Sequence, residues 1–172
     1  MSLQTKQTFA VLNQMVADGV IENYAVAGAI GAMFYVEPFS TKDLDVLVTT
    51  PEDRLIIELP GWGYLKAHGY TKVENEGIVV EGWPVQFLPA TTPLEREAYV
   101  NAQMLSVEEI PVRVARPEHL VAIMLKVGRQ KDIARITMFL SQEAVEISAL
   151  EDLINRHGLS EKWLDYKRSV LK

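Results

Sequence analysis

Residues 41–48 carry the sequence TKDLDVLV, in which two acids interrupt an apolar run. The apolar and β-branched residues predict a buried strand over residues 43–49. Because side chains alternate between the faces of a strand, we predict that Asp43 and Asp45 project from one face and share a divalent cation. The alternative is that both acids are solvated turn residues. Asp45 has apolar neighbours, however, and an unpaired buried carboxylate is costly, so the sequence favours metal binding.

The composition limits the class of protein. The chain has 172 residues, of which 48% are hydrophobic, so it can bury one core in a single compact unit. Its net charge of -6 argues against a broad nucleic-acid-binding surface. The absence of cysteine excludes disulfides, thiolate metal sites and thiol nucleophiles. The first residues lack the apolar core of a signal peptide, and no segment is apolar for long enough to span a bilayer, so we expect a cytoplasmic protein without membrane contact.

The sequence before the acidic strand predicts a strand, a glycine turn and a buried helix. Apolar residues at helical spacing first predict an amphipathic helix over residues 4–21. The short apolar segment 24–27 then predicts a strand, Gly28 predicts a turn, and residues 29–36 predict a compact apolar helix that ends before Pro38.

Short elements are predicted after the acidic strand. Pro111 cannot donate a ladder hydrogen bond, so the strand that contains it is predicted to lie at an edge of the sheet. The predicted elements are a helical region opening at Pro51, a helix over 64–68, consecutive strands at 71–74, 77–81 and 84–88, a helix at 93–100 and a last strand at 110–115.

The last third of the chain is predicted to be helical. One helix follows Pro117, a second covers residues 132–140, and two more begin from Ala149 onward. We therefore predict an α+β protein, with a mixed β-sheet flanked by helices in residues 1–116. A small C-terminal helical bundle in residues 117–172 is expected to pack on this core within one compact unit.

Two motifs in this order resemble the signature of the nucleotidyltransferase superfamily. The sequence VAGAIGA at residues 26–32 precedes STKDLD at 40–45, and the family pattern is Gly-Gly or Gly-Ser at a helix start followed by Asp-x-Asp on the next strand. The sequence PEHLVAIMLKVGRQKD at 117–132 is similar to the helical segment of the bacterial AbiEii-like (type IV toxin) branch and its uncharacterised relatives. The resemblance implies transfer of a nucleoside monophosphate from a nucleoside triphosphate to an unknown hydroxyl or amine acceptor, dependent on Mg²⁺ or Mn²⁺. It also implies an antitoxin-like protein partner.

The resemblance assigns roles that suit a magnesium nucleotide. Mg²⁺ takes one or two carboxylates, with phosphate oxygens and waters completing its coordination. Gly28 lets backbone approach phosphate, and the helix after it offers unpaired N–H groups. Lys126 is the best candidate for a cation that contacts phosphate, and helical spacing places it on one helix face with Arg129. Lys131 is rotated away from that face unless the helix breaks near Gly128. The predicted site comprises Asp43 and Asp45 as catalytic and metal-binding acids, with Gly28, Ala29, Thr41, Lys126 and Arg129 contacting nucleotide or phosphate.

The chain departs from the family pattern at two positions. Gln86 stands where active relatives carry a third acid, and a neutral amide cannot act as a carboxylate base. Phe39 stands where many relatives place an arginine. Glu81 would replace the missing acid only if a bulge at Gly82 changed the side-chain alternation. Transfer is therefore less well supported than nucleotide binding.

Three functions are left open by the sequence. The first is a nucleotidyltransferase. The second is a nucleotide- or partner-binding protein of the same fold with weak or no transfer, and the third is an interaction protein that docks a partner through its apolar C-terminal stripes. The alternative for Lys126 and Arg129 is a solvated helix face. Asp132 has the helical spacing to pair with Arg129 or Arg135.

Overall fold

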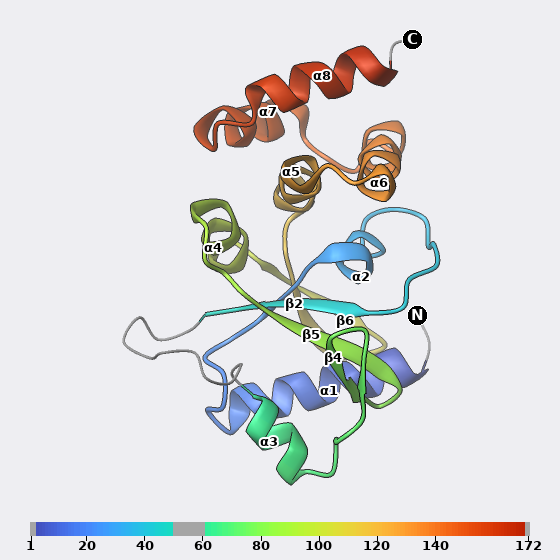
Figure 1. Ribbon diagram of the computed structural model, residues 1–172, viewed down its shortest axis with the longest axis vertical. Helices are drawn as coiled ribbons and strands as arrows, with labels where there is room; N and C mark the ends of the chain where they lie inside the picture. The colour runs from blue at the N-terminus through green and yellow to red at the C-terminus, as the bar shows by residue number, and fades with distance from the viewer. Residues whose placement is uncertain (1–2, 50–60, 171–172) are drawn as a thin grey trace.

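The computed structural model describes residues 3–49 and 61–170, which form one mixed sheet and eight helices (Figure 1). The strands are β1 (Ala25–Val26), β2 (Leu44–Val48), β3 (Val73–Glu74), β4 (Gly77–Val80), β5 (Trp83–Pro89), β6 (Gln103–Val107) and β7 (Ile110–Val114). The helices are α1 (Leu3–Ala17), α2 (Gly28–Ala32), α3 (Trp62–Ala67), α4 (Pro93–Val100), α5 (Pro117–Val127), α6 (Gln130–Ser141), α7 (Ile147–Arg156) and α8 (Ser160–Val170).

The sheet has seven strands in the order β3-β4-β5-β2-β1-β7-β6. Its central pair, β2 and β5, is parallel over five residue pairs, and β1 is parallel to β7. The other neighbours are antiparallel, including the hairpins β4-β5 and β6-β7. The predicted α+β class with a mixed sheet is confirmed, and the three strands predicted as consecutive are neighbours.

Helices cover both faces of the sheet (Figure 1). Helices α1 and α3 lie on one face, while α2, α4 and α5 lie on the other, with α6, α7 and α8 beyond α5. Alternation along β2 places Val46 in the core on the α1 side and Leu47 in the core on the α5 side. The core on the α5 side also contains Leu125 and Leu153, so the C-terminal helices share a hydrophobic core with the sheet.

Several element boundaries differ from the prediction. Helix α1 ends at Ala17, earlier than predicted, because Gly19 adopts a left-handed φ of 68° and the chain turns. Helix α2 ends at Ala32, and turns replace the rest of the predicted helix. The sequence did not predict β6, whose residues alternate between partly buried and exposed. The helical region predicted from Pro51 lies outside the described residues.

The predicted edge position of the strand containing Pro111 is wrong. That strand, β7, lies between β1 and β6. The proline is tolerated because β1 pairs with β7 only at Val114, so no strand needs an N–H from Pro111 on that side. Asn13 Nδ2 instead donates to the Pro111 carbonyl at 2.8 Å.

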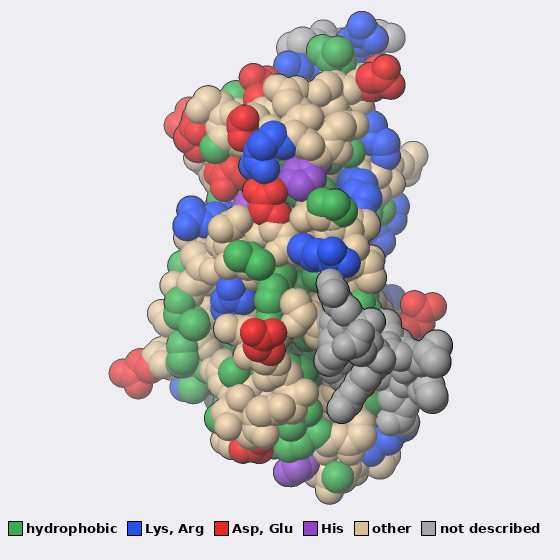
Figure 2. Space-filling view, turned by 90° about the vertical axis from the view of Figure 1, so that its left-hand side faces the viewer, with side chains coloured by type: hydrophobic (Ala, Val, Ile, Leu, Met, Phe, Trp, Pro, Cys, Tyr) green, Lys and Arg blue, Asp and Glu red, His purple; other side chains and the backbone are tan. Residues whose placement is uncertain are grey.

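Charged side chains of both signs are interspersed over the face of the molecule that Figure 2 shows. Within the described part of the chain, no helix combines the length and apolar character needed to cross a membrane.

Candidate functional site

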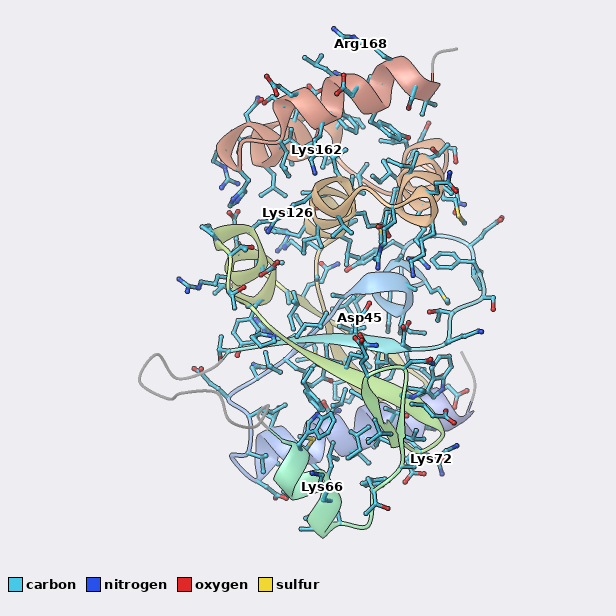
Figure 3. The ribbon with its side chains drawn as sticks, viewed as in Figure 1. Asp45, Lys66, Lys72, Lys126, Lys162 and Arg168 are labelled. Carbon is cyan, nitrogen blue, oxygen red and sulfur yellow. The ribbon has the colours of Figure 1, made fainter. Side chains whose placement is uncertain are left out.

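Asp45 lies in the second position of β2, at the centre of the sheet. Its backbone carbonyl accepts a hydrogen bond from the Ala27 N–H at 2.9 Å, which ties β2 to the end of β1. Its side chain shares the face of Leu47, which is the face that carries α2, α4 and α5 (Figure 3). The acid therefore faces the C-terminal helices. Asp43 lies before the strand, so the common face predicted for the two acids stays a prediction.

Gly28 makes room for the Asp45 carboxylate. The glycine begins α2 with a φ of 56°, and a Cβ built on it would lie 1.9 Å from Asp45 Oδ2 and 2.8 Å from Cγ. Any side chain at this position would therefore both strain the backbone and displace the acid. The side chain of Ala29, in contrast, is buried in the core.

Gln86 is the register partner of Asp45 across the parallel pair β2 and β5. The position expected to carry a third acid is thus beside Asp45, but it holds an amide whose Nε2 donates to the Asn75 carbonyl. Glu81 does not replace it. Its carboxylate accepts a hydrogen bond from the Tyr70 hydroxyl at 2.6 Å, and it is not among the residues that line the pocket around Asp45.

A pocket of about 390 Å³ opens between the sheet and the helices α5 and α6. Asp45, Gln86 and Gly28 form its polar wall on the sheet side. Residues of α5, the adjoining turn and α6 form the opposite wall. Its lining consists of Ala27, Gly28, Asp45, Leu47, Gln86, Leu88, Pro89, Thr91, Glu95, Leu120, Ile123, Met124, Val127, Arg129, Asp132 and Arg135.

The Asp45 carboxylate has no partner within the described residues. No group there donates a hydrogen bond to it, and no Lys, Arg or His forms an ion pair with it. Burial raises the pKa of Asp45 above its ordinary value of 3.8, and the charge of Asp43 raises it further. Arg129, Lys131 and Arg135 oppose this rise without contacting the carboxylate. A bound cation would satisfy this acid.

Asp132 holds the arginines on the opposite wall. Its side chain is 1% exposed, and its two oxygens accept hydrogen bonds from Arg129 Nε at 2.7 Å and Nη2 at 3.2 Å. Arg135 Nη1 lies 3.6 Å from the same carboxylate. The pairing of Asp132 with both arginines, which the sequence left as an alternative, is therefore present. Because both arginines also line the pocket, the pairing does not remove them from the site.

The expectation that Lys126 and Arg129 share a helix face is wrong. Helix α5 ends at Val127, and Gly128 adopts a left-handed φ of 74° before α6 begins. Lys126 Nζ lies 3.1 Å from Thr92 Oγ1 and 3.5 Å from Glu95 Oε1, on the side of α5 nearer α4 (Figure 3). It therefore does not line the pocket that contains Asp45.

Asp43 and Thr41 lie just before β2, because the strand begins at Leu44 rather than at residue 43. Thr41 Oγ1 donates to Asp43 Oδ1 at 3.1 Å. Neither residue lines the pocket, and Thr41 lines a separate hollow with Phe39 and Trp83. Asp43 is nevertheless close enough for its charge to raise the pKa of Asp45.

The residues present fit a cation site with few carboxylates. Within residues 3–49 and 61–170, no group of three or more His, Cys, Asp or Glu side chains is arranged to hold a metal ion. Asp45 and Asp43 are the carboxylates available, with the neutral amide of Gln86 beside them. Mg²⁺ accepts such a set, because it binds one or two protein carboxylates and takes its other ligands from phosphates and water.

The sequence did not single out two polar residues of the pocket, Arg135 and Glu95. Arg135 follows Asp132 by three residues, a helical spacing that suggested an ion pair but not an orientation toward Asp45. Glu95 belongs to a capping box at the start of α4, in which Thr92 Oγ1 accepts from the Glu95 N–H. The sequence of that turn, TTPLE, contained this signal.

The fold is similar to that of a solved protein. A crystal structure of an antigenic nucleotidyltransferase-like protein from Paracoccidioides brasiliensis superposes with a TM-score of 0.59 and 17% sequence identity, covering 94% of this chain and 92% of that chain. No protein-family model and no curated protein sequence matches the chain. The similarity in structure shows that the chain has a nucleotidyltransferase-like fold.

Proposed function

We propose that the chain is a nucleotidyltransferase that moves a nucleoside monophosphate from a nucleoside triphosphate to a hydroxyl or amine acceptor, with Mg²⁺ or Mn²⁺ as its metal. One observation carries this proposal. The pocket holds on one wall the Asp45 carboxylate, which has no hydrogen-bond or ion-pair partner among the described residues, and on the other wall the guanidinium groups of Arg129 and Arg135. A metal–triphosphate complex presents a cation to the first wall and phosphate oxygens to the second.

Each residue has a defined task in the transfer. Asp45, with Asp43, would hold the metal ion, which when bound neutralises charge on the phosphates. Arg129 would bind phosphate oxygens and stabilise the charge that develops on the departing pyrophosphate. The absence of a side chain at Gly28 leaves the acid accessible.

The acceptor oxygen or nitrogen attacks the α-phosphorus in this reaction. A new bond forms to that phosphorus, and the bond to the bridging oxygen breaks, so that pyrophosphate leaves with the electron pair. The acceptor also loses a proton. Gln86 carries no carboxylate and cannot take that proton, so water accepts it in this proposal.

A second function is favoured by Gln86 itself. A protein that binds the metal–nucleotide complex but transfers slowly would have the same pocket without a third carboxylate.

The assignment to the AbiEii-like branch, and with it an antitoxin-like partner, rests on the sequence resemblance of residues 117–132 alone.

Labelled nucleotides test the proposal. Each of the four triphosphates, labelled at the α-phosphate, is incubated with the protein, Mg²⁺ and mixed RNA, protein and small-molecule acceptors. We expect label in one acceptor fraction, with loss of about 100-fold or more for Asp45→Ala and Asp43→Ala. Asp165→Ala is the control, because Asp165 is exposed on α8 and its substitution leaves the pocket intact. Nucleotide binding without incorporation would favour the second function, and the absence of both would overturn the proposal.

A further inference from the structure

Arg135 has an environment that differs from that of the other arginines near the sheet. Its side chain is 12% exposed, lines the pocket and lies with its guanidinium carbon 4.9 Å from the ring centroid of Phe39. Phe39 precedes β2, so this contact joins the segment that leads to the acids with α6. A cation over an aromatic face is attracted by the ring and held in place.

The donors of Arg135 are unused within the described part of the chain. No acceptor there makes a hydrogen bond with its five N–H groups, and Asp132 at 3.6 Å is its ion-pair partner. Asp132 is already engaged, because it accepts two hydrogen bonds from the Arg129 side chain. A guanidinium that is largely removed from water and makes no hydrogen bonds is costly unless a ligand supplies acceptors.

Arg113 provides a comparison within the same molecule. Its guanidinium also lies over an aromatic ring, 5.2 Å from the centroid of Tyr99. Its Nη1 and Nη2, however, donate to the carbonyls of Tyr24 at 3.1 Å and Val100 at 3.0 Å. Arg113 therefore uses its donors in a structural role. Arg135 has the same kind of aromatic support, but within the described residues none of its donors makes a hydrogen bond.

The charge of Arg135 acts on the space in front of Asp45. The ion-pair partner of Arg135 among the described residues is Asp132, so Arg135 is not paired with Asp45. The two opposite charges thus line one pocket without contact. An anion bound to Arg135 would lie in the space between them.

We propose that Arg135 binds the polyphosphate chain of the nucleotide through two or more N–H donors, with Phe39 and Asp132 positioning its guanidinium. The inference rests on the proposed nucleotide site and deepens it, because it assigns Arg135 direct hydrogen bonds to the phosphates beside the role already given to Arg129. Arginine suits this role because its planar group can donate two parallel hydrogen bonds to one phosphate.

Binding of inorganic tripolyphosphate in the presence of Mg²⁺ tests Arg135 without a nucleobase or acceptor. Titration calorimetry is performed on the wild-type protein, Arg135→Met, Arg135→Lys and Arg168→Met. The last variant matches the charge change at an exposed position of α8. We expect Arg135→Met to weaken binding by about 10-fold to 100-fold, because two hydrogen bonds to a charged group are lost. Arg135→Lys should lie between Arg135→Met and wild type, since lysine keeps the charge but not the bidentate geometry, and Arg168→Met should bind as wild type does.

Thermal unfolding without ligand separates binding from structure. If Arg135 serves the ligand, Arg135→Met should melt at about the same temperature as wild type, because Asp132 keeps its two hydrogen bonds from Arg129 and no hydrogen bond of Arg135 within the described residues is lost. A lower melting temperature together with unchanged tripolyphosphate affinity would assign Arg135 a structural role and overturn the proposal. Wild type that binds no polyphosphate would also overturn it. Polyphosphate binding that depends on Arg135, without label transfer, would leave this inference standing and contradict the transferase function alone.

Discussion

Gly28 and the carboxylate of Asp45 lie so close together that a methyl group on the glycine would be 1.9 Å from Asp45 Oδ2. The glycine belongs to the turn after β1, and the acid belongs to β2. The turn and the acid are therefore one structural unit.

Gly28→Ala should abolish metal–nucleotide binding and destabilise the fold. The new Cβ would displace the acid and hold alanine at a φ of 56°, which together cost about 2 kcal/mol or more. Gly158→Ala is the matched control, because Gly158 has a φ of 67° and a Cβ there meets no atom within 4 Å. Chemical denaturation and nucleotide titration measure both effects. Equal losses of stability and unchanged binding in both variants would show that the contact with Asp45 is unimportant.

Asp45→Asn should separate stability from function. The substitution removes a partly buried negative charge that has no partner in the described structure and is repelled by Asp43. We therefore expect a higher melting temperature without ligand, and no further rise when Mg²⁺ and nucleotide are added. Differential scanning calorimetry with and without ligand measures this. A variant that is less stable than wild type would indicate that the acid has a structural partner.

Gln86→Glu should increase transfer and metal affinity. The new carboxylate would stand beside Asp45 in the parallel register and supply a further oxygen ligand with negative charge. The hydrogen bond from Gln86 Nε2 to the Asn75 carbonyl would be lost, which should cost about 1 kcal/mol of stability. Initial rates of label incorporation at several Mg²⁺ concentrations test this. If the rate does not rise while the protein stays folded, the third-acid position is not what limits transfer.

Glu97 should make the free energy of unfolding depend on pH under acidic conditions. Its carboxylate accepts hydrogen bonds from Arg156 Nη1 and Nη2, each at 2.9 Å, and lies 2.6 Å from His157 Nε2. Hydrogen bonding from Arg156, followed by that from His157, lowers its pKa from 4.5 to about 2. Because the folded value is the lower one, the stabilisation is complete above pH 4.5 and is lost as the pH falls toward about 2.

Glu97→Gln isolates this contribution, because it removes the titrating group and keeps a hydrogen-bond acceptor. The difference in unfolding free energy between wild type and Glu97→Gln should shrink as the pH falls from 4.5 toward about 2. Urea unfolding followed by circular dichroism at several pH values gives this difference. A difference that does not change with pH would contradict the lowered pKa.

Local sequence signals were enough to predict β2 and the strand, turn and helix that precede it in the sequence. The apolar residues around Asp45 predicted the strand that carries it, and Gly28 marked the turn that accommodates its side chain. Both strands carried clear β-type sequences, but their parallel pairing, which places Gln86 beside Asp45, is a contact between distant segments that only the structure shows.

The positions of the cationic side chains on the wall opposite the sheet depend on contacts that no local sequence pattern contains. Arg135 reaches the pocket because Phe39, distant in the sequence, supports its guanidinium. Lys126 was placed with Arg129 by helical spacing, but Gly128 ends the helix between them. A glycine within a helical pattern was the signal for that break, and its left-handed backbone decided the outcome.

The two walls of the pocket, one formed by the sheet and the other by α5 and α6, come from segments that are synthesised at different times. A ribosome synthesises β2 with its acid before Arg129 and α6 with Arg135, so in the proposed site a phosphate anion would be bound only after α5 and α6 have docked on the sheet. On this proposal, ligand binding is a property of the finished fold. A polyphosphate present during refolding would bind only those molecules in which the C-terminal helices have reached their place, and it would draw the population toward them.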